Sequence, residues 1–303
     1  MNKEKVIIIG NDGNVGRGIV KALSDNYSVT GIDVTSGKGI EDYSAEELKE
    51  MLHEGIDIVY AAEVGNRDEY ETNLNLSEEN NQRFREFCLK ITGTGIAVRL
   101  HYIGGSWTKR GIEGLLVSDA SPNKDLHDAN AYEKAKISAE ENAETLAAEL
   151  NLDISFYDWA SVVPNFAPNF SIYKMTQEAL DEGQITYSPG DYGRPLLHAV
   201  DAGRALRLIA EAEGDIISGK FRKYLIPGVF TPFSKFAEIV REIVEDKTGK
   251  KIKLVEQKET PEFLKTKSES KHLKELGFKG SKEMVEEGLR ETCEVALRDL
   301  GED

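Results

Sequence analysis

Cysteine is scarce in this chain, whose 303 residues include only Cys88 and Cys293. The two lie far apart without metal-ligand spacing, so we expect neither a disulfide framework nor a metal site. Long apolar runs are also missing, and the first residues lead directly into a strand-like segment without a signal peptide. We therefore expect a cytoplasmic protein that has no bound metal and no membrane partner.

Basic residues are also fewer than acidic residues in this chain. The chain has 38 Lys and Arg against 54 Asp and Glu, a net charge of −16. A nucleic acid would have to be met by clustered Lys and Arg, so we exclude it as the main partner. An anionic small molecule needs only a few local cations and stays possible. Hydrophobic residues make up 40% of the chain and charged residues 30%, which is typical of a globular protein with a sizeable core.

The N-terminal segment combines a buried-strand pattern with a glycine turn. The branched apolar run Val6–Ile9 is typical of a central parallel strand, and Gly10, Gly13 and Gly16 follow at a spacing of three. Where a helix follows such a turn, unpaired N–H groups and the helix dipole converge on a pyrophosphate. Asp33 ends the next strand-like segment, where an acidic residue accepts hydrogen bonds from an adenosine ribose. Together these features predict a dinucleotide site rather than an ordinary strand-to-helix turn.

Strands and helices alternate through the first half of the chain. Further strands are predicted at 56–62, 96–103 and 153–157, and helices from Ser44, over 69–91 and over 130–150. The alternation predicts an α/β fold with a doubly wound parallel sheet of the Rossmann type. Ligands bind such sheets at the carboxyl ends of the strands, where Gly10, Asp33, Ala61 and Ser106 would lie. Beyond Pro164 the pattern becomes irregular, with clear helices only at 234–246 and 282–300.

Tyr132 and Lys136 lie four residues apart in a predicted helix, so both can face one ligand. A phenol is a poor base at neutral pH, but a nearby ammonium and an oxidised nicotinamide favour the phenolate. Tyr132 could then exchange the proton of a secondary alcohol while hydride moves to or from the nicotinamide. Among the 11 tyrosines, only Tyr132 is followed by Lys four positions later. Ser106 adds a neutral hydroxyl that can bond a carbonyl or alkoxide.

These motifs together resemble the extended short-chain dehydrogenase/reductase family, specifically its NAD-dependent epimerase/dehydratase group. The segments 57–62, 193–201 and 273–278 extend the resemblance over nearly the whole chain. It implies a catalytic set of Ser106, Tyr132 and Lys136. It also implies NAD as the cofactor, favoured over NADP by Asp33, and a cofactor site made of Gly10, Gly13, Asn14, Val15, Gly16, Asp33, Ala61, Ala62, Tyr132 and Lys136.

The resemblance also bears on organisation and substrate. We expect an NAD-binding domain over 1–164, to which 195–213 return, and a mainly substrate-binding region over 165–303. The resemblance implies that Arg194 contacts a diphosphate, with Asn165 or Asn169 beside it, and Trp107 could line the pocket. It also suggests a homodimer packed through helices near 70–90 and 130–150. His101 and His198 are expected to be structural.

The favoured hypothesis is an NAD-dependent oxidoreductase or epimerase that acts on a sugar or nucleotide sugar through Tyr132. One alternative is an NAD(P)-dependent reductase or dehydrogenase of a small non-sugar ketone or alcohol. Another is a non-catalytic dinucleotide-sensing protein. Dehydration is disfavoured because Trp107 follows Ser106, where sugar dehydratases carry an acidic pair. Asp158 and Trp159 replace the Arg and Pro of many relatives, so the pocket floor is expected to differ.

Overall fold

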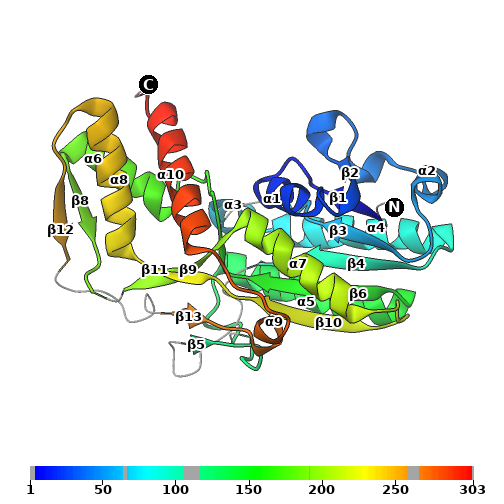
Figure 1. Cartoon of the computed structure of the whole chain (residues 1–303). Coiled ribbons are helices and arrows are strands. Elements are labelled where there is room, and N and C mark those ends of the chain that lie inside the picture. The colour runs from blue at the N-terminus through cyan, green and yellow to red at the C-terminus, as the bar shows by residue number, and fades with distance from the viewer. Residues whose placement is uncertain are drawn as a thin grey trace.

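The computed structural model describes residues 4–63, 67–105, 116–123, 125–190, 192–257 and 266–301. At its centre is a parallel sheet in the order β2-β1-β3-β4-β6-β10 (Figure 1). The strands are β1 (Glu4–Ile9), β2 (Tyr27–Ile32), β3 (Ile56–Tyr60), β4 (Val98–Ile103), β6 (Asp153–Trp159) and β10 (Phe221–Ile226). The strand order reverses between β1 and β3, which is the switch point where such sheets bind ligands.

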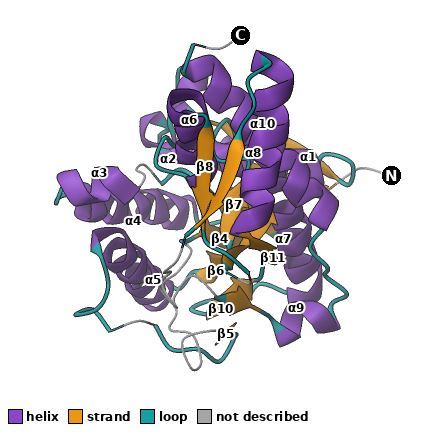
Figure 2. Ribbon diagram, turned by 90° about the vertical axis from the view of Figure 1, so that its left-hand side faces the viewer, coloured by secondary structure: helices purple, strands orange, loops and turns teal. Residues whose placement is uncertain are grey.

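Helices cover both faces of this sheet (Figure 2). One group is α2 (Ala45–Met51), α4 (Leu76–Thr94) and α5 (Ala131–Leu150), and the other is α1 (Asn14–Leu23) and α7 (Ala199–Glu213). Ile7 and Ile9 of β1 pack into the first group's core, whereas Val6 and Ile8 pack into the core of the second. Successive strand residues point to opposite faces, so an unbroken apolar run serves both cores. The predicted doubly wound α/β fold is confirmed.

The remaining elements form a second body beside the sheet (Figure 1). Its helices are α6 (Ser171–Glu182), α8 (Phe233–Thr248) and α10 (Lys282–Asp299). They pack together over a separate core that includes Ile172, Phe236 and Leu289. Short strands complete it: β7 (Ser161–Val163), β9 (Gly193–His198) and β11 (Val229–Pro232) in one sheet, β8 (Gln184–Tyr187) with β12 (Lys253–Glu256), and β5 (Leu116–Val117) with β13 (Lys267–Ser268). The short helix α9 (Lys271–Glu275) precedes α10.

Helix α7 is joined to α1 by very close packing. A Cβ on Gly18 would lie 2.3 Å from the Cβ of Ala199, and one on Gly203 would lie 2.5 Å from the Cβ of Ala22. Residues 199–213 therefore lie on the sheet, and β10, which the sequence pattern did not assign to it, forms its edge. None of the helices in the described ranges combines the length and apolarity needed to cross a membrane.

The single helix predicted over 69–91 is wrong. The structure has α3 (Arg67–Thr72), a break, and then α4. Asn73 makes the break, because its Oδ1 accepts a hydrogen bond from the N–H of Asn75 at 3.1 Å. An Asn side chain that bonds nearby backbone competes with the helix for those groups. The predicted helix start at Ser44 is confirmed, since Ser44 and Glu47 form a reciprocal capping box.

Candidate active site

The glycine turn brings β1, α1 and β3 together. Gly10 has φ of +83°, and a Cβ there would lie 2.6 Å from the carbonyl oxygen of Ala61. A Cβ on Gly16 would lie 2.0 Å from the oxygen of Gly10. Gly13 precedes α1 and offers no side-chain cap, so the first N–H groups of that helix are available to an anion. The geometry fits a pyrophosphate at the switch point of the sheet.

Asp33 lies at the end of β2, facing this turn. Its carboxylate accepts hydrogen bonds from the N–H of Asp12 at 3.1 Å and of Thr35 at 3.0 Å. Burial alone would raise the pKa of Asp33, but these bonds outweigh it and hold the pKa below its usual value. Asp33 is therefore an ionised acceptor where an adenosine ribose is expected.

The other predicted cofactor residues surround the turn, although two serve partly structural roles. Asn14 donates its side-chain N–H to the carbonyl oxygen of Pro164, which ties α1 to the loop after β7. Val15 packs against the core below α1. Ala61 and Ala62 follow β3, and the N–H of Ala61 donates to Ile9 at 2.8 Å. These small residues leave room above the carboxyl end of β3.

Tyr132 and Lys136 both project from the first turns of α5. Asn130 caps this helix in a reciprocal capping box with Glu133, which fixes where it begins. Lys136 is 5% exposed, and its Nζ lies 5.1 Å from the centre of the Tyr132 ring. Gly105 leaves space for the lysine stem, because a Cβ there would lie 2.2 Å from Lys136 Cγ. Ser106 and Trp107 lie outside the described residues.

Glu63 is a site residue that the sequence reasoning missed. Its Oε2 lies 2.5 Å from Lys136 Nζ, and its Oε1 accepts a hydrogen bond of 2.8 Å from the Tyr70 hydroxyl. Burial would lower the pKa of Lys136, but the charge of Glu63 reverses this and raises it. The Tyr70 ring stands edge-on to Tyr132 at 5.7 Å. The sequence feature that could have indicated Glu63 was its position, because it directly follows the small residues Ala61 and Ala62 at the end of β3.

Arg194 lies on β9, between the N-termini of α6 and α8. Its Nη2 donates to Ser171 Oγ at 3.2 Å, and its guanidinium lies over the rings of Phe170 and Phe233 at 5.9 and 5.3 Å. No carboxylate among the described residues forms an ion pair with it. Burial, together with the charge of Arg67, lowers the pKa of Arg194 to about 10. The first turns of α6 and α8 carry no acidic residue.

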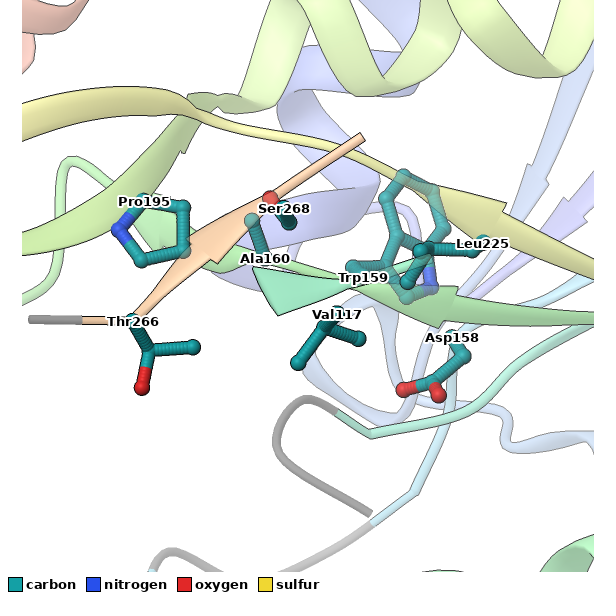
Figure 3. Close-up of a pocket in the computed structure, with 8 residues that line it drawn as sticks. All are labelled: Val117, Asp158, Trp159, Ala160, Pro195, Leu225, Thr266 and Ser268. Carbon is teal, nitrogen blue, oxygen red and sulfur yellow. The ribbon is translucent and has the colours of Figure 1, made fainter. Parts of the chain in front are cut away.

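Asn165 and Trp159 lie in different surroundings. Asn165 uses its Oδ1 to accept the N–H of Ala167 at 3.0 Å, which is a turn contact. Asp158 and Trp159 line a cavity of about 20 Å³ at the carboxyl end of β6, together with Pro195 and Ser268 (Figure 3). That volume holds about one water molecule. The indole N–H of Trp159 is buried there, and no hydrogen-bond partner for it lies among the described residues.

Both candidate histidines have structural partners. His101 is fully buried, with Nδ1 at 2.7 Å from the Tyr157 hydroxyl and Nε2 at 3.2 Å from Asp57. His198 caps α7, and its Nδ1 accepts the N–H of Val200 at 3.2 Å. Within the described ranges, His, Cys, Asp and Glu form no group that could hold a metal ion.

Comparison with known proteins gives one family and many similar folds. The model of the NAD-dependent epimerase/dehydratase family matches residues 6–221. No curated protein sequence matches the chain at a significant level. The family match covers more than half of the chain, so it does not depend on an isolated motif.

Three solved structures illustrate the similarity of fold. A UDP-N-acetylglucosamine 4-epimerase from Methanobrevibacter ruminantium M1, in complex with UDP-N-acetylmuramic acid, is 18% identical with a TM-score of 0.70, over 99% of this chain and 100% of that one. A UDP-glucuronic acid 4-epimerase from Bacillus cereus, with UDP-glucuronic acid and NAD, is 16% identical with a TM-score of 0.69, over 97% and 99%. DesIV, a dTDP-glucose 4,6-dehydratase from Streptomyces venezuelae with NAD bound, is 17% identical with a TM-score of 0.67, over 97% of each chain.

Proposed function

Because the chain belongs to the NAD-dependent epimerase/dehydratase family, we propose that it oxidises a secondary alcohol of a nucleotide sugar to a ketone, or reduces such a ketone to the alcohol. The glycine turn, the N-terminus of α1 and Asp33 would hold the dinucleotide. When bound, NAD supplies the acceptor and donor of hydride. Solved structures of similar fold contain UDP-sugars together with NAD, and this supports the same pairing of ligands here.

The observation that carries the proposal is the half-buried guanidinium of Arg194. A charge withdrawn from water normally has a partner of opposite sign, yet among the described residues the partners found for Arg194 are the Ser171 hydroxyl and two aromatic faces. Two helix N-termini beside it add positive potential. Such a place suits a diphosphate, because arginine bonds phosphate oxygens in a bidentate way.

Helix α3 connects this anion site with the phenol. Tyr70 of α3 contacts the Tyr132 ring, and the charge of Arg67, three residues earlier, acts on Arg194. Residues three apart on a helix lie about one turn apart on the same face. A ligand with its diphosphate at Arg194 could therefore lie along α3 with its sugar toward Tyr132.

The chain's own residues would handle the proton. Tyr132 would remove the proton of the sugar hydroxyl as hydride leaves the carbon that bears this hydroxyl. It would return the proton when the ketone is reduced. Lys136 contributes a fixed positive charge beside the phenol, which favours the phenolate. Ser106, by family resemblance, would bond the reacting oxygen. The first turns of α5 thus supply both the acid/base group and its neighbouring charge.

The test is turnover and binding with a panel of UDP-, GDP- and dTDP-sugars beside simple ketones. We expect Tyr132→Phe to lower kcat by about 10²- to 10⁴-fold while nucleotide-sugar affinity stays unchanged. Arg194→Ala should weaken nucleotide-sugar binding by about 10- to 100-fold, as expected for lost charge-assisted hydrogen bonds. Ser171→Ala is the matched control, because it removes only the neutral partner of Arg194.

Three results would count against the proposal. Turnover of simple ketones that is indifferent to Arg194→Ala would favour the small-substrate reductase. Binding of NAD with no turnover lost in Tyr132→Phe would favour a dinucleotide sensor. If Arg194→Ala leaves the nucleotide-sugar affinity unchanged, Arg194 does not bind the diphosphate. The proposed substrate class then loses its support.

A further inference from the structure

The Lys136 ammonium is enclosed almost completely by protein. Its side chain is 6% exposed, and that of Glu63 is 9% exposed. The Tyr70 and Tyr132 rings lie 5.6 and 5.1 Å from Nζ, and Gly105 lies against the aliphatic stem. Among the described residues, Glu63 alone forms an ion pair with Lys136. Without it, burial would favour loss of the proton from this lysine.

Both oxygens of the Glu63 carboxylate are assigned to different partners. Oε2 contacts Lys136, and Oε1 accepts a hydrogen bond from Tyr70 on α3. The Tyr70 hydroxyl in turn accepts a hydrogen bond of 2.9 Å from Asn80 Nδ2 on α4. Glu63 therefore contacts α5 through Lys136 and α3 through Tyr70, and α4 fixes the Tyr70 hydroxyl that bonds it.

We propose that Glu63 is a positioning residue that keeps the Lys136 ammonium charged and fixed beside Tyr132. The inference rests on the proposed function, in which Tyr132 and Lys136 act together in proton transfer. A buried lysine can supply its charge only while it stays protonated, and the adjacent carboxylate provides this condition before any ligand arrives. Tyr70 completes the arrangement, because it orients Glu63 and packs against Tyr132.

The first experiment titrates Lys136 in the cofactor-free protein by NMR of ¹⁵N-labelled lysine side chains, with the signal assigned through Lys136→Met. We expect wild-type Lys136 to titrate above an ordinary lysine, and Glu63→Gln to lower its midpoint by at least about one pH unit, a tenfold change in proton affinity. Glu63→Asp, which keeps the charge, should restore part of the difference. Tyr70→Phe removes a hydrogen bond without removing charge and should leave the midpoint nearly unchanged.

The second experiment follows kcat against pH in the same variants. The alkaline limb should move to lower pH in Glu63→Gln by the same amount as the lysine titration, and Glu63→Asp should partly restore it. An unchanged Lys136 midpoint in Glu63→Gln overturns the proposal. If Glu63→Gln does not fold, Glu63→Ala takes its place, because it also removes the charge, and an unchanged Lys136 midpoint in that variant is the contrary result.

Failure of the inference and failure of the proposed function are distinguishable. If Glu63→Gln leaves the Lys136 titration midpoint unchanged while Tyr132→Phe loses turnover, the role of Glu63 is refuted and the proposed function stands. A shifted midpoint combined with full turnover in Tyr132→Phe refutes the catalytic pair, and the role of Glu63 in catalysis fails with it.

Discussion

The N–H of Asp12 donates a 3.1 Å hydrogen bond to the carboxylate of Asp33, so the glycine turn and the end of β2 are joined directly. The Thr35 hydroxyl lies between the two acids, 2.5 Å from Asp12 Oδ2 and 3.0 Å from Asp33 Oδ1. Two carboxylates are thus close together where the adenosine ribose is expected. A 2′-phosphate would meet both of them.

Cofactor selectivity should therefore require two substitutions to change. Asp33→Asn alone is expected to weaken NAD binding by about tenfold through the lost acceptor, with little gain for NADP because Asp12 still repels its phosphate. Asp33→Asn combined with Asp12→Asn should improve NADP binding by about tenfold. Calorimetric titration of both cofactors measures this, with Asp25→Asn, an exposed acid in the turn before β2, as the control. An equal gain from the single and double variants would contradict the prediction.

Arg67 should assist Arg194 through its charge. Its side chain is 61% exposed and pairs with Glu71 at 3.4 Å, so its loss should barely affect folding. Arg67→Ala is expected to weaken UDP binding by roughly threefold to tenfold, and the difference should shrink as salt screens the charges. UDP titrations at two salt concentrations measure this. Arg85→Ala, which removes another surface-paired arginine, should leave the affinity unchanged, and an equal loss there would attribute the effect to net charge.

Most of the fold could be predicted because the sheet's sequence pattern is local. The apolar run Val6–Ile9 and the capping box at Ser44 each specify an element without help from distant residues. The split at Asn73 depended on one side-chain hydrogen bond, which periodicity does not reveal. β10 lies at the sheet edge because it pairs with β6. The residues of β10 alone do not indicate which distant strand they pair with.

The site was only partly predictable for a related reason. Motif spacing identified Tyr132 and Lys136, because residues four apart on one helix must share a face. Glu63, Tyr70 and Asp12 belong to no spacing pattern, and only the folded arrangement of α3, α5 and the turn gives them their partners. The roles of the predicted site residues, the division at residue 164 and the homodimer stay predictions.

A buried charge cluster at the other end of the sheet predicts acid sensitivity. Arg99 contacts Asp57 at 2.9 Å and Glu213 at 3.1 Å, and Arg222 lies 3.6 Å from Glu213. Burial would raise the pKa of Glu213, but nearby positive charge and a hydrogen bond from Ser155 lower it below its usual value. A carboxyl whose pKa is lower in the folded state stabilises the protein above its unfolded pKa, and this contribution is lost as pH falls through the folded value.

Glu213→Gln should destabilise the protein by roughly 3 kcal/mol at pH 7, because it leaves buried guanidinium groups under-compensated. The difference from wild type should start to shrink as pH falls below about 4.3, the value of an unfolded glutamate, and disappear below the lower pKa of Glu213 in the folded protein. Urea unfolding between pH 3 and pH 7 tests both statements. Ser155→Ala removes a 2.7 Å hydrogen bond to Glu213 without removing charge, and it should cost about 1 kcal/mol. A loss of equal size at every pH would exclude the electrostatic explanation.

Gly105 offers a way to displace Lys136 without changing any charged group. An alanine Cβ there would lie 2.2 Å from Lys136 Cγ and 2.5 Å from Cδ, so the lysine stem must move. We expect Gly105→Ala to lower kcat by about 10- to 100-fold, since small misplacements in a catalytic site have large effects on rate. The affinity for NAD should fall far less, because the glycine turn is untouched.

Gly93→Ala is the matched control, since a Cβ at this position in α4 meets nothing within 4 Å. Its kcat should equal that of wild type, and Ala's higher helix propensity should leave the protein no less stable. The lysine titration in Gly105→Ala should also move, because the ammonium can no longer keep its 2.5 Å contact with Glu63. Unchanged kcat together with an unchanged titration would mean that the backbone at Gly105 yields to the methyl group and that Lys136 keeps its place.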